Sequence, residues 1–201
     1  MFSHSADSRP RVPENLSFPQ WISVLHLSAL WNMEKLSKRV LEKMSASSRN
    51  IEDWTALLDM LSINHPLSEA RTLAIQKISS ISGSLGGTQM VLLGRKYHVR
   101  NWVRDGIRQL VNRGSFSEED EVKLGSQTLL KLYRIREDRH REEVRQLRET
   151  SSETPSFDWG SSSGATDWGY EDPGPAKLDS VVGAGIEKEF GSELEAIQQQ
   201  D

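Results

Sequence analysis

The feature that most constrains this fold is an apolar pattern that occurs three times along the chain at a spacing of about 33. Five apolar positions that begin at Met33 recur from Leu67, at an offset of 34, and again from Val99, at a further offset of 32. Each set follows the three- and four-residue steps of one buried helix face. The members are Met33, Leu36, Val40, Leu41 and Met44, then Leu67, Ala70, Ala74, Ile75 and Ile78, then Val99, Trp102, Gly106, Ile107 and Leu110.

Another helix precedes each of these sets. Trp21 and Trp54 correspond at an offset of 33, and LSALW at 27–31 aligns with LGRKY at 93–97 at an offset of 66. Two helices per repeat of this length are typical of stacked helical hairpins, in which each pair buries its face against a neighbour. We therefore predict an all-α fold of three helix pairs, with SGSLGGT at 82–88 as a flexible joint before the third pair.

A longer helix is expected after the third pair, because Ser117 and Asp120 have the spacing of a helix N-cap and its partner. Its apolar side would carry Val122, Leu129, Leu132, Tyr133 and Ile135, and charged residues follow. Core packing is the role predicted for Trp21, Trp31, Trp54 and Trp102, since each lies within an apolar stripe.

Charge divides the chain near residue 150. Residues 151–201 carry eleven acids and two lysines, a net of −9, whereas the preceding residues carry a net of +5. We predict a disordered leader over 1–17, a helical domain over 18–150 and an acidic, mostly disordered tail over 151–201. A short helix at 184–198 is the exception within the tail. It would either bind a partner or fold back onto the basic helical body.

The tail holds the residues predicted to contact another protein. Asp-Trp-Gly occurs twice, around Trp159 and Trp168, in a segment with no apolar stripe. An aromatic side chain in an acidic, unpacked segment suits a groove on a partner. Phe190 and Leu194 lie at helical spacing among acids and are predicted to form a second contact.

Residues that could support catalysis or bind metal are not brought together by the sequence. The chain has no cysteine, and its five histidines are scattered without the spacing of a helical metal pair. No nucleophile motif or phosphate-binding loop occurs. We therefore expect a protein without catalytic, cofactor or metal sites. The missing cysteines and the lack of a long apolar run favour an intracellular protein, in the cytoplasm or nucleus, without a membrane segment.

Three phrases resemble a known protein family. They are WISVLHLSALW at 21–31, LGRKYHVRNWV at 93–103 and EEDEVKLGSQTLLKLYRIRED at 118–138. They are similar to the region that follows the BTB/POZ domain in basidiomycete fungal BTB proteins. The resemblance implies a protein-interaction or adaptor module. A BTB domain needs on the order of a hundred residues before Phe18, so we expect it to be absent, and no functional residue is carried over.

A nucleic-acid-associated or transcription-associated role is the alternative. Six basic residues cluster on the third helix pair, and phosphate binding would need this basic face to be uncompensated by acids. They are Arg95, Lys96, Arg100, Arg104, Arg108 and Arg113.

Overall fold

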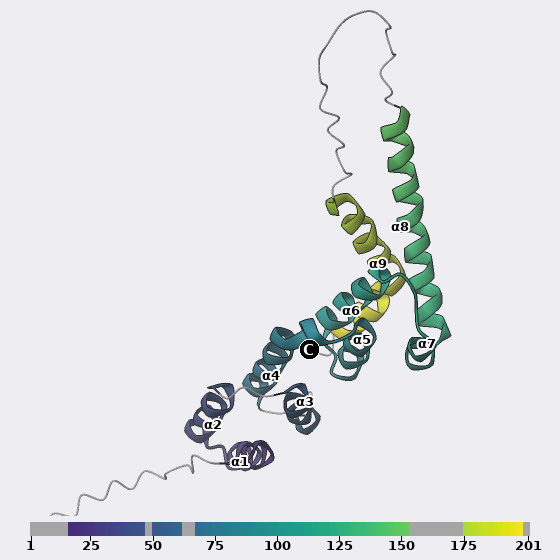
Figure 1. Ribbon diagram of the computed structural model, residues 1–201. Helices are drawn as coiled ribbons and strands as arrows, with labels where there is room; N and C mark the ends of the chain where they lie inside the picture. Colours follow the sequence, from purple (N-terminus) through teal and green to yellow (C-terminus); the bar gives the residue numbers. More distant parts are fainter. Residues whose placement is uncertain (1–15, 47–49, 62–66, 153–174, 199–201) are drawn as a thin grey trace, which may run out of the picture. The chain divides into compact units, whose positions relative to one another are not determined.

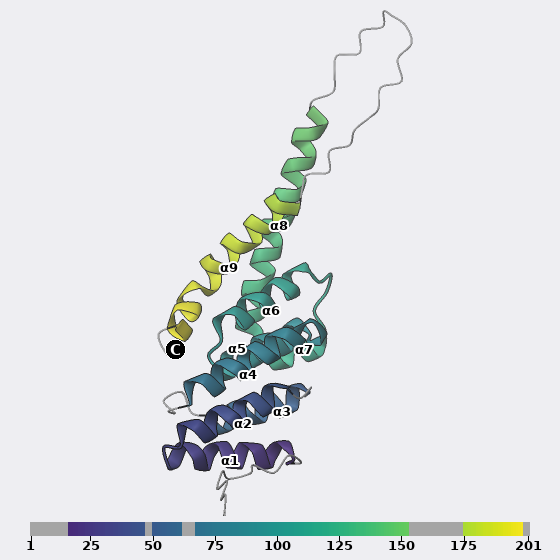
Figure 2. The ribbon, with the colours of Figure 1, turned by 90° about the vertical axis from the view of Figure 1, so that its left-hand side faces the viewer.

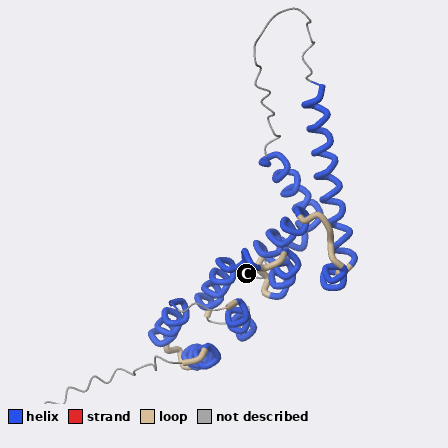
Figure 3. The backbone as a smooth tube through the Cα atoms, in the orientation of Figure 1, coloured by secondary structure: helices blue, strands red, loops and turns tan. Residues whose placement is uncertain are grey.

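The computed structural model describes residues 16–46, 50–61, 67–152 and 175–198. Within these ranges the chain forms α-helices and one short 3-10 turn, with no β-strand (Figures 1 and 3). This confirms the predicted all-α class. The helical region predicted as one domain divides into two compact units, residues 1–81 and 82–201, and the division falls at the predicted joint.

Unit 1 contains the first two helix pairs. In the first, α1 (Phe18–Leu30) packs against α2 (Glu34–Ala46), and in the second α3 (Ile51–Met60) packs against α4 (Ser68–Ile81) (Figure 2). Phe18 and Trp54 meet edge to face, with ring centroids 5.4 Å apart, and this contact joins α1 to α3. Trp21 and Trp54 are both buried, as their positions in the apolar stripes predict.

The turn between α1 and α2 is a Schellman motif. Asn32 adopts a left-handed backbone conformation with φ of 53°. The Met33 N–H donates to the Ser28 carbonyl at 2.7 Å, and the Asn32 N–H donates to the Ala29 carbonyl at 3.1 Å. These two bonds satisfy carbonyl groups that the helix end leaves without partners, and they reverse the chain within a short turn.

The same turn recurs at an offset of 66, between α5 (Gly87–Lys96) and α6 (Arg100–Asn112) of unit 2. His98 has φ of 55°, and the Val99 N–H donates to the Gly94 carbonyl at 2.8 Å. The repeat in the sequence is therefore a repeat of backbone geometry. The two helices of each pair also meet in the same register. The hydroxyls of Ser28 and Ser37 lie 2.7 Å apart in the first pair, and Gly94 lies against Val103 at the corresponding positions of the third.

Two glycines let α5 and α6 approach closely. A Cβ atom on Gly106 would lie 2.7 Å from the carbonyl oxygen of Gly87, closer than real contacts of that kind. At the corresponding positions of the first pair stand Trp21 and Val40. The third pair thus uses a close backbone contact where the first uses large side chains, which explains why Gly106 looks like a weak member of its stripe.

The longer helix predicted from Ser117 is interrupted. α7 (Glu118–Leu124) and α8 (Ser126–Ser152) are separated by Gly125, whose φ of 79° lies outside the helical range and is readily reached only by glycine. Because the break reorients α7, Val122 is 81% exposed instead of facing the core. Tyr133 is also exposed, whereas Leu129, Leu132 and Ile135 are buried as predicted.

Asp120 anchors the start of α7. Its carboxylate accepts hydrogen bonds from the Ser117 N–H at 2.9 Å and the Thr88 hydroxyl at 2.5 Å, and it pairs with Arg113 at 3.2 Å. Burial alone would raise the pKa of this carboxyl. The hydrogen bonds from Thr88 and Ser117, together with the Arg113 charge, outweigh burial and hold the pKa below its ordinary value. The carboxylate thus fastens α7 to α5.

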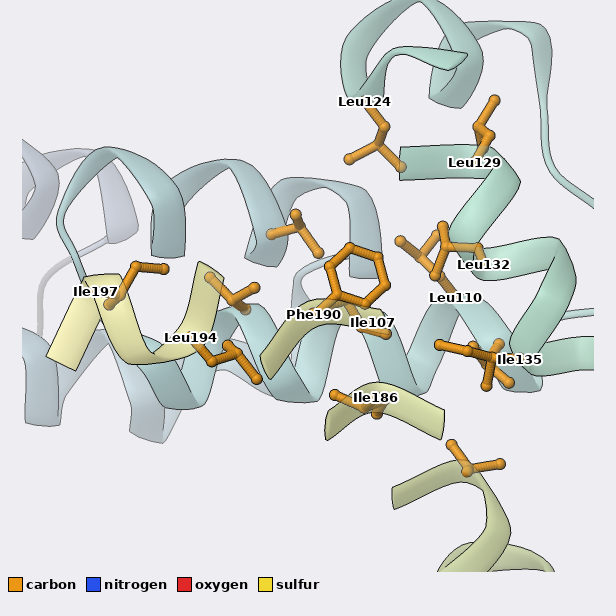
Figure 4. Close-up of a cluster of buried hydrophobic side chains, with 14 residues drawn as sticks. Ile107, Leu110, Leu124, Leu129, Leu132, Ile135, Ile186, Phe190, Leu194 and Ile197 are labelled. Atoms are coloured by element: carbon orange, nitrogen blue, oxygen red, sulfur yellow. The ribbon is translucent and has the colours of Figure 1, made fainter. Parts of the chain in front are cut away.

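The part of the tail that is described is helical and packed, which corrects the tail boundary predicted at residue 150. α9 (Pro175–Gln198) is longer than the predicted helix at 184–198 and packs against α6 and α8. Its apolar stripe completes the core of unit 2 around Phe190 (Figure 4). Burying each large apolar side chain contributes about 1.5–3 kcal/mol. The stripe consists of Val182, Ile186, Phe190, Leu194 and Ile197.

The segment that holds the two Asp-Trp-Gly copies and most of the predicted leader lie outside the described residues. Of the two arrangements considered for the tail helix, the structure has the folded-back one. Sequence spacing alone did not decide between them, because an amphipathic helix can bury its stripe against its own chain or against another.

The Gly87–Gly106 contact gives a direct test of the third pair. We expect Gly106→Ala to lower the free energy of unfolding of unit 2 by about 1–3 kcal/mol, since the added methyl group meets backbone that cannot move aside. Gly114→Ala is the matched control, because a Cβ atom there would have no atom within 4 Å. Urea unfolding followed by circular dichroism measures both. Equal midpoints for the two variants would contradict the close contact.

Candidate protein-interaction surface

The structure describes two of the four residues predicted to bind a partner. Trp159 and Trp168 lie outside the described residues. Phe190 and Leu194 are 0% exposed within the core of unit 2, so their predicted role at a partner interface is wrong for this folded state. Both side chains point to the body because their stripe faces α6 and α8, while Glu193, the one acid between them, pairs with Arg95.

An exposed apolar surface lies instead at the end of the first helix pair. Four of the eight large apolar side chains that are exposed in the described part of the chain fall within residues 27–33. Leu27 is 44%, Leu30 64%, Trp31 64% and Met33 45% exposed. We call these four residues the α1 patch. Grouped exposed apolar residues of this kind mark interaction sites, whereas single ones are ordinary.

Helix geometry explains why the α1 patch faces away from the core. The buried residues of α1 lie on one side and include Trp21, Leu25 and Ser28. Leu27 and Leu30 project from the opposite side at 100° per residue, and Trp31 follows as the C-cap. The outward side of the first two turns is polar, with Gln20 and Ser23. Only the last part of α1 is therefore apolar on both sides.

The internal repeat shows that the first pair differs from the third in this exposure. In the third pair, Tyr97 stands at the position of Trp31 and is 9% exposed, and Val99 stands at the position of Met33 and is 8% exposed. At the position of Leu30 stands Lys96, an exposed residue. The first pair therefore places leucine where the third places lysine, and leaves uncovered the two side chains that the third pair buries.

A groove of about 340 Å³ adjoins the α1 patch within unit 1. The end of α1, the turn at Asn32, the first turns of α2 and the start of α4 line it, and Met33 belongs to both the groove and the patch. Glu34, Lys38 and Glu69 give its walls both signs of charge. The groove is large enough for a side chain of a partner that covers the patch, and its mixed charges suit a polar one.

The basic face of the third pair is largely neutralised by acids. Arg95 forms a bidentate pair with Glu193, at 2.7 and 3.2 Å, and Arg100 and Arg104 both pair with Glu187. Arg113 pairs with Asp120, and Arg108 lies 4.0 Å from Asp105. Five of the six basic residues of this face therefore have a carboxylate within 4.0 Å, so acids compensate much of its charge.

No group of three or more potential metal ligands occurs among the residues that the structure describes. In the same residues, no helix combines the length and apolar character needed to cross a membrane. Comparison with known proteins found no match, whether to a protein family, to a curated protein or to a solved structure.

The sequence interpretation missed the α1 patch because it assigned Trp31 and Met33 to buried stripes. Periodicity places a side chain on a helix face but does not say whether anything covers that face. The signal was present in the alignment of LSALW with LGRKY, where a leucine replaces a lysine at an exposed position.

Substitution of two tryptophans, one exposed and one buried, tests whether the α1 patch is separate from the core. We expect Trp31→Ala to change the free energy of unfolding by no more than about 0.5 kcal/mol, as for exposed positions generally. Trp102→Ala should cost about 3–5 kcal/mol, because this side chain is buried in the third pair. Chemical unfolding of both variants measures the difference. A large loss for Trp31→Ala would show that this residue supports the fold and is not free to bind.

Proposed function

We propose that this chain is a non-catalytic protein-interaction module that docks a partner protein on the α1 patch. The uncovered apolar positions of the first pair carry the proposal, because at three of the four corresponding positions the third pair has the buried Tyr97 and Val99 and the lysine at 96. Trp31 would be the central anchor, since tryptophan is enriched among residues that dominate binding energy. The groove beside Met33 would receive a polar side chain at the rim.

The resemblance to the region after the BTB domain in fungal BTB proteins agrees with this role. Adaptors of that kind work by joining other proteins, and a helical body with an open apolar end is suited to such joining.

Binding should depend on Trp31 and Leu30. We expect Trp31→Ala to weaken partner binding by at least about 30-fold, equivalent to about 2 kcal/mol. Leu30→Lys should do the same while preserving the fold, because lysine already stands at the corresponding position 96. Affinity capture with quantitative mass spectrometry compares these variants with the unchanged chain, and a photo-crosslinking residue at position 27 identifies direct contacts.

Val122→Lys is the matched control, since Val122 is an exposed apolar residue of unit 2, outside the α1 patch. It should retain every partner. Recovery of the same crosslinked proteins with Leu30→Lys and with the unchanged chain would refute the α1 patch as the docking surface.

The alternative function, a nucleic-acid-associated factor, would require the basic residues of the third pair to be available to phosphate groups. Because acids occupy its arginines, we expect at most weak binding to DNA or RNA at about 0.15 M salt, where electrostatic binding has already fallen steeply. Fluorescence anisotropy with labelled oligonucleotides measures it. A submicromolar affinity at that salt concentration, lost in an Arg104→Glu variant, would favour the alternative.

A further inference from the structure

Unit 2 contains a second candidate surface, which α9 covers. The groove is formed by α6 and α8, and α9 fills it with one apolar stripe (Figure 4). The stripe repeats at steps of four, four, four and three residues, from Val182 to Ile197. We call this surface the α9 groove. It has the form of a groove that accepts an amphipathic helix.

Basic side chains around the α9 groove select an acidic helix. Glu193 meets Arg95 on one side, and Glu187 meets Arg100 and Arg104. On the other side Glu189 lies 3.4 Å from Arg134 of α8. Such pairs at the rim contribute mainly to the choice of partner and of register, because apolar burial supplies most of the binding.

Two glycines lower the helix propensity of α9 at positions where its packing does not require glycine. A Cβ atom on Gly183 or Gly191 would have no atom within 4 Å, so neither position needs glycine for space. Gly185 differs, because a Cβ atom there would lie 3.0 Å from the Ile135 side chain. Glycine within a helix disfavours helix formation relative to alanine. α9 therefore binds its groove more weakly than a helix that makes the same contacts but has alanine at these two positions.

α9 is joined to the rest of unit 2 through the connection formed by residues 153–174. Because α9 belongs to the same chain, it competes for the groove as an intramolecular ligand. A competing helix must therefore bind more tightly than α9, and the two glycines without packing contacts leave room for that.

From these observations we infer that the α9 groove is a binding site for an acidic amphipathic helix of another protein, which takes the place of α9. The ligand has large apolar residues at four-residue steps and acids placed to meet Arg95, Arg104 and Arg134. It is a second interaction surface, on a different unit from the α1 patch, and does not depend on the proposed function.

The test uses the full chain with a protease site placed within residues 153–174, before and after cleavage. The probe is a fluorescent peptide of residues 175–198 with Gly183→Ala and Gly191→Ala, and anisotropy reports binding. After cleavage, we expect this peptide to displace α9 and to bind roughly 20- to 30-fold more tightly than the unaltered peptide. Before cleavage, the tether should weaken binding of both peptides.

Charge exchange distinguishes this site from nonspecific binding. A probe that also carries Glu193→Arg should fail on the cleaved chain and bind again to a chain with Arg95→Glu. A probe with Glu195→Arg is the matched control and should bind like its parent, because Glu195 is exposed. Circular dichroism verifies that each cleaved chain stays helical.

No rise in anisotropy with a cleaved chain that remains folded would overturn the inference, as would binding that the charge exchange does not restore. Trp31→Ala should leave peptide binding unchanged. The experiment therefore distinguishes a wrong inference about the α9 groove from a wrong proposal about the α1 patch.

Discussion

The left-handed residue that ends the first helix is the constraint on which the first and third hairpins depend. Asn32 and His98 each turn the chain so that backbone N–H groups reach carbonyls of the preceding helix. Once the turn is set, the register of the two helices is fixed. Ser28 then meets Ser37, and Gly94 meets Val103, at matching positions of the two pairs. The same backbone frame can therefore carry different surfaces.

The first and third pairs use that shared frame differently. In the third pair, Tyr97 and Val99 are buried, and two glycines bring the helices together. In the first pair, the corresponding tryptophan and methionine are exposed beside two further leucines. One pair is closed and the other has an open apolar side, which supports assigning the docking role to the first.

Apolar periodicity predicted the helix class, the three pairs and most of the core, because spacing along a helix determines which side chains share a face. Periodicity was less informative about burial at positions where another element does or does not cover the helix face. Trp31 and Val122 have the spacing of core residues and are exposed, whereas Phe190 was assigned to a partner and is buried. Long-range packing decides these positions. The break at Gly125 was missed because glycine is also tolerated inside helices, and only its positive φ identifies a turn.

The ion pairs between α9 and the third pair also affect how other molecules approach. Opposite charges held a few ångströms apart cancel beyond the Debye length, which is about 8 Å at physiological ionic strength. These pairs therefore add little to the long-range field of unit 2. The α1 patch carries no charge at all. For the docking proposed there, the patch itself supplies no electrostatic steering, and we expect an association rate of about 10⁵–10⁶ M⁻¹s⁻¹.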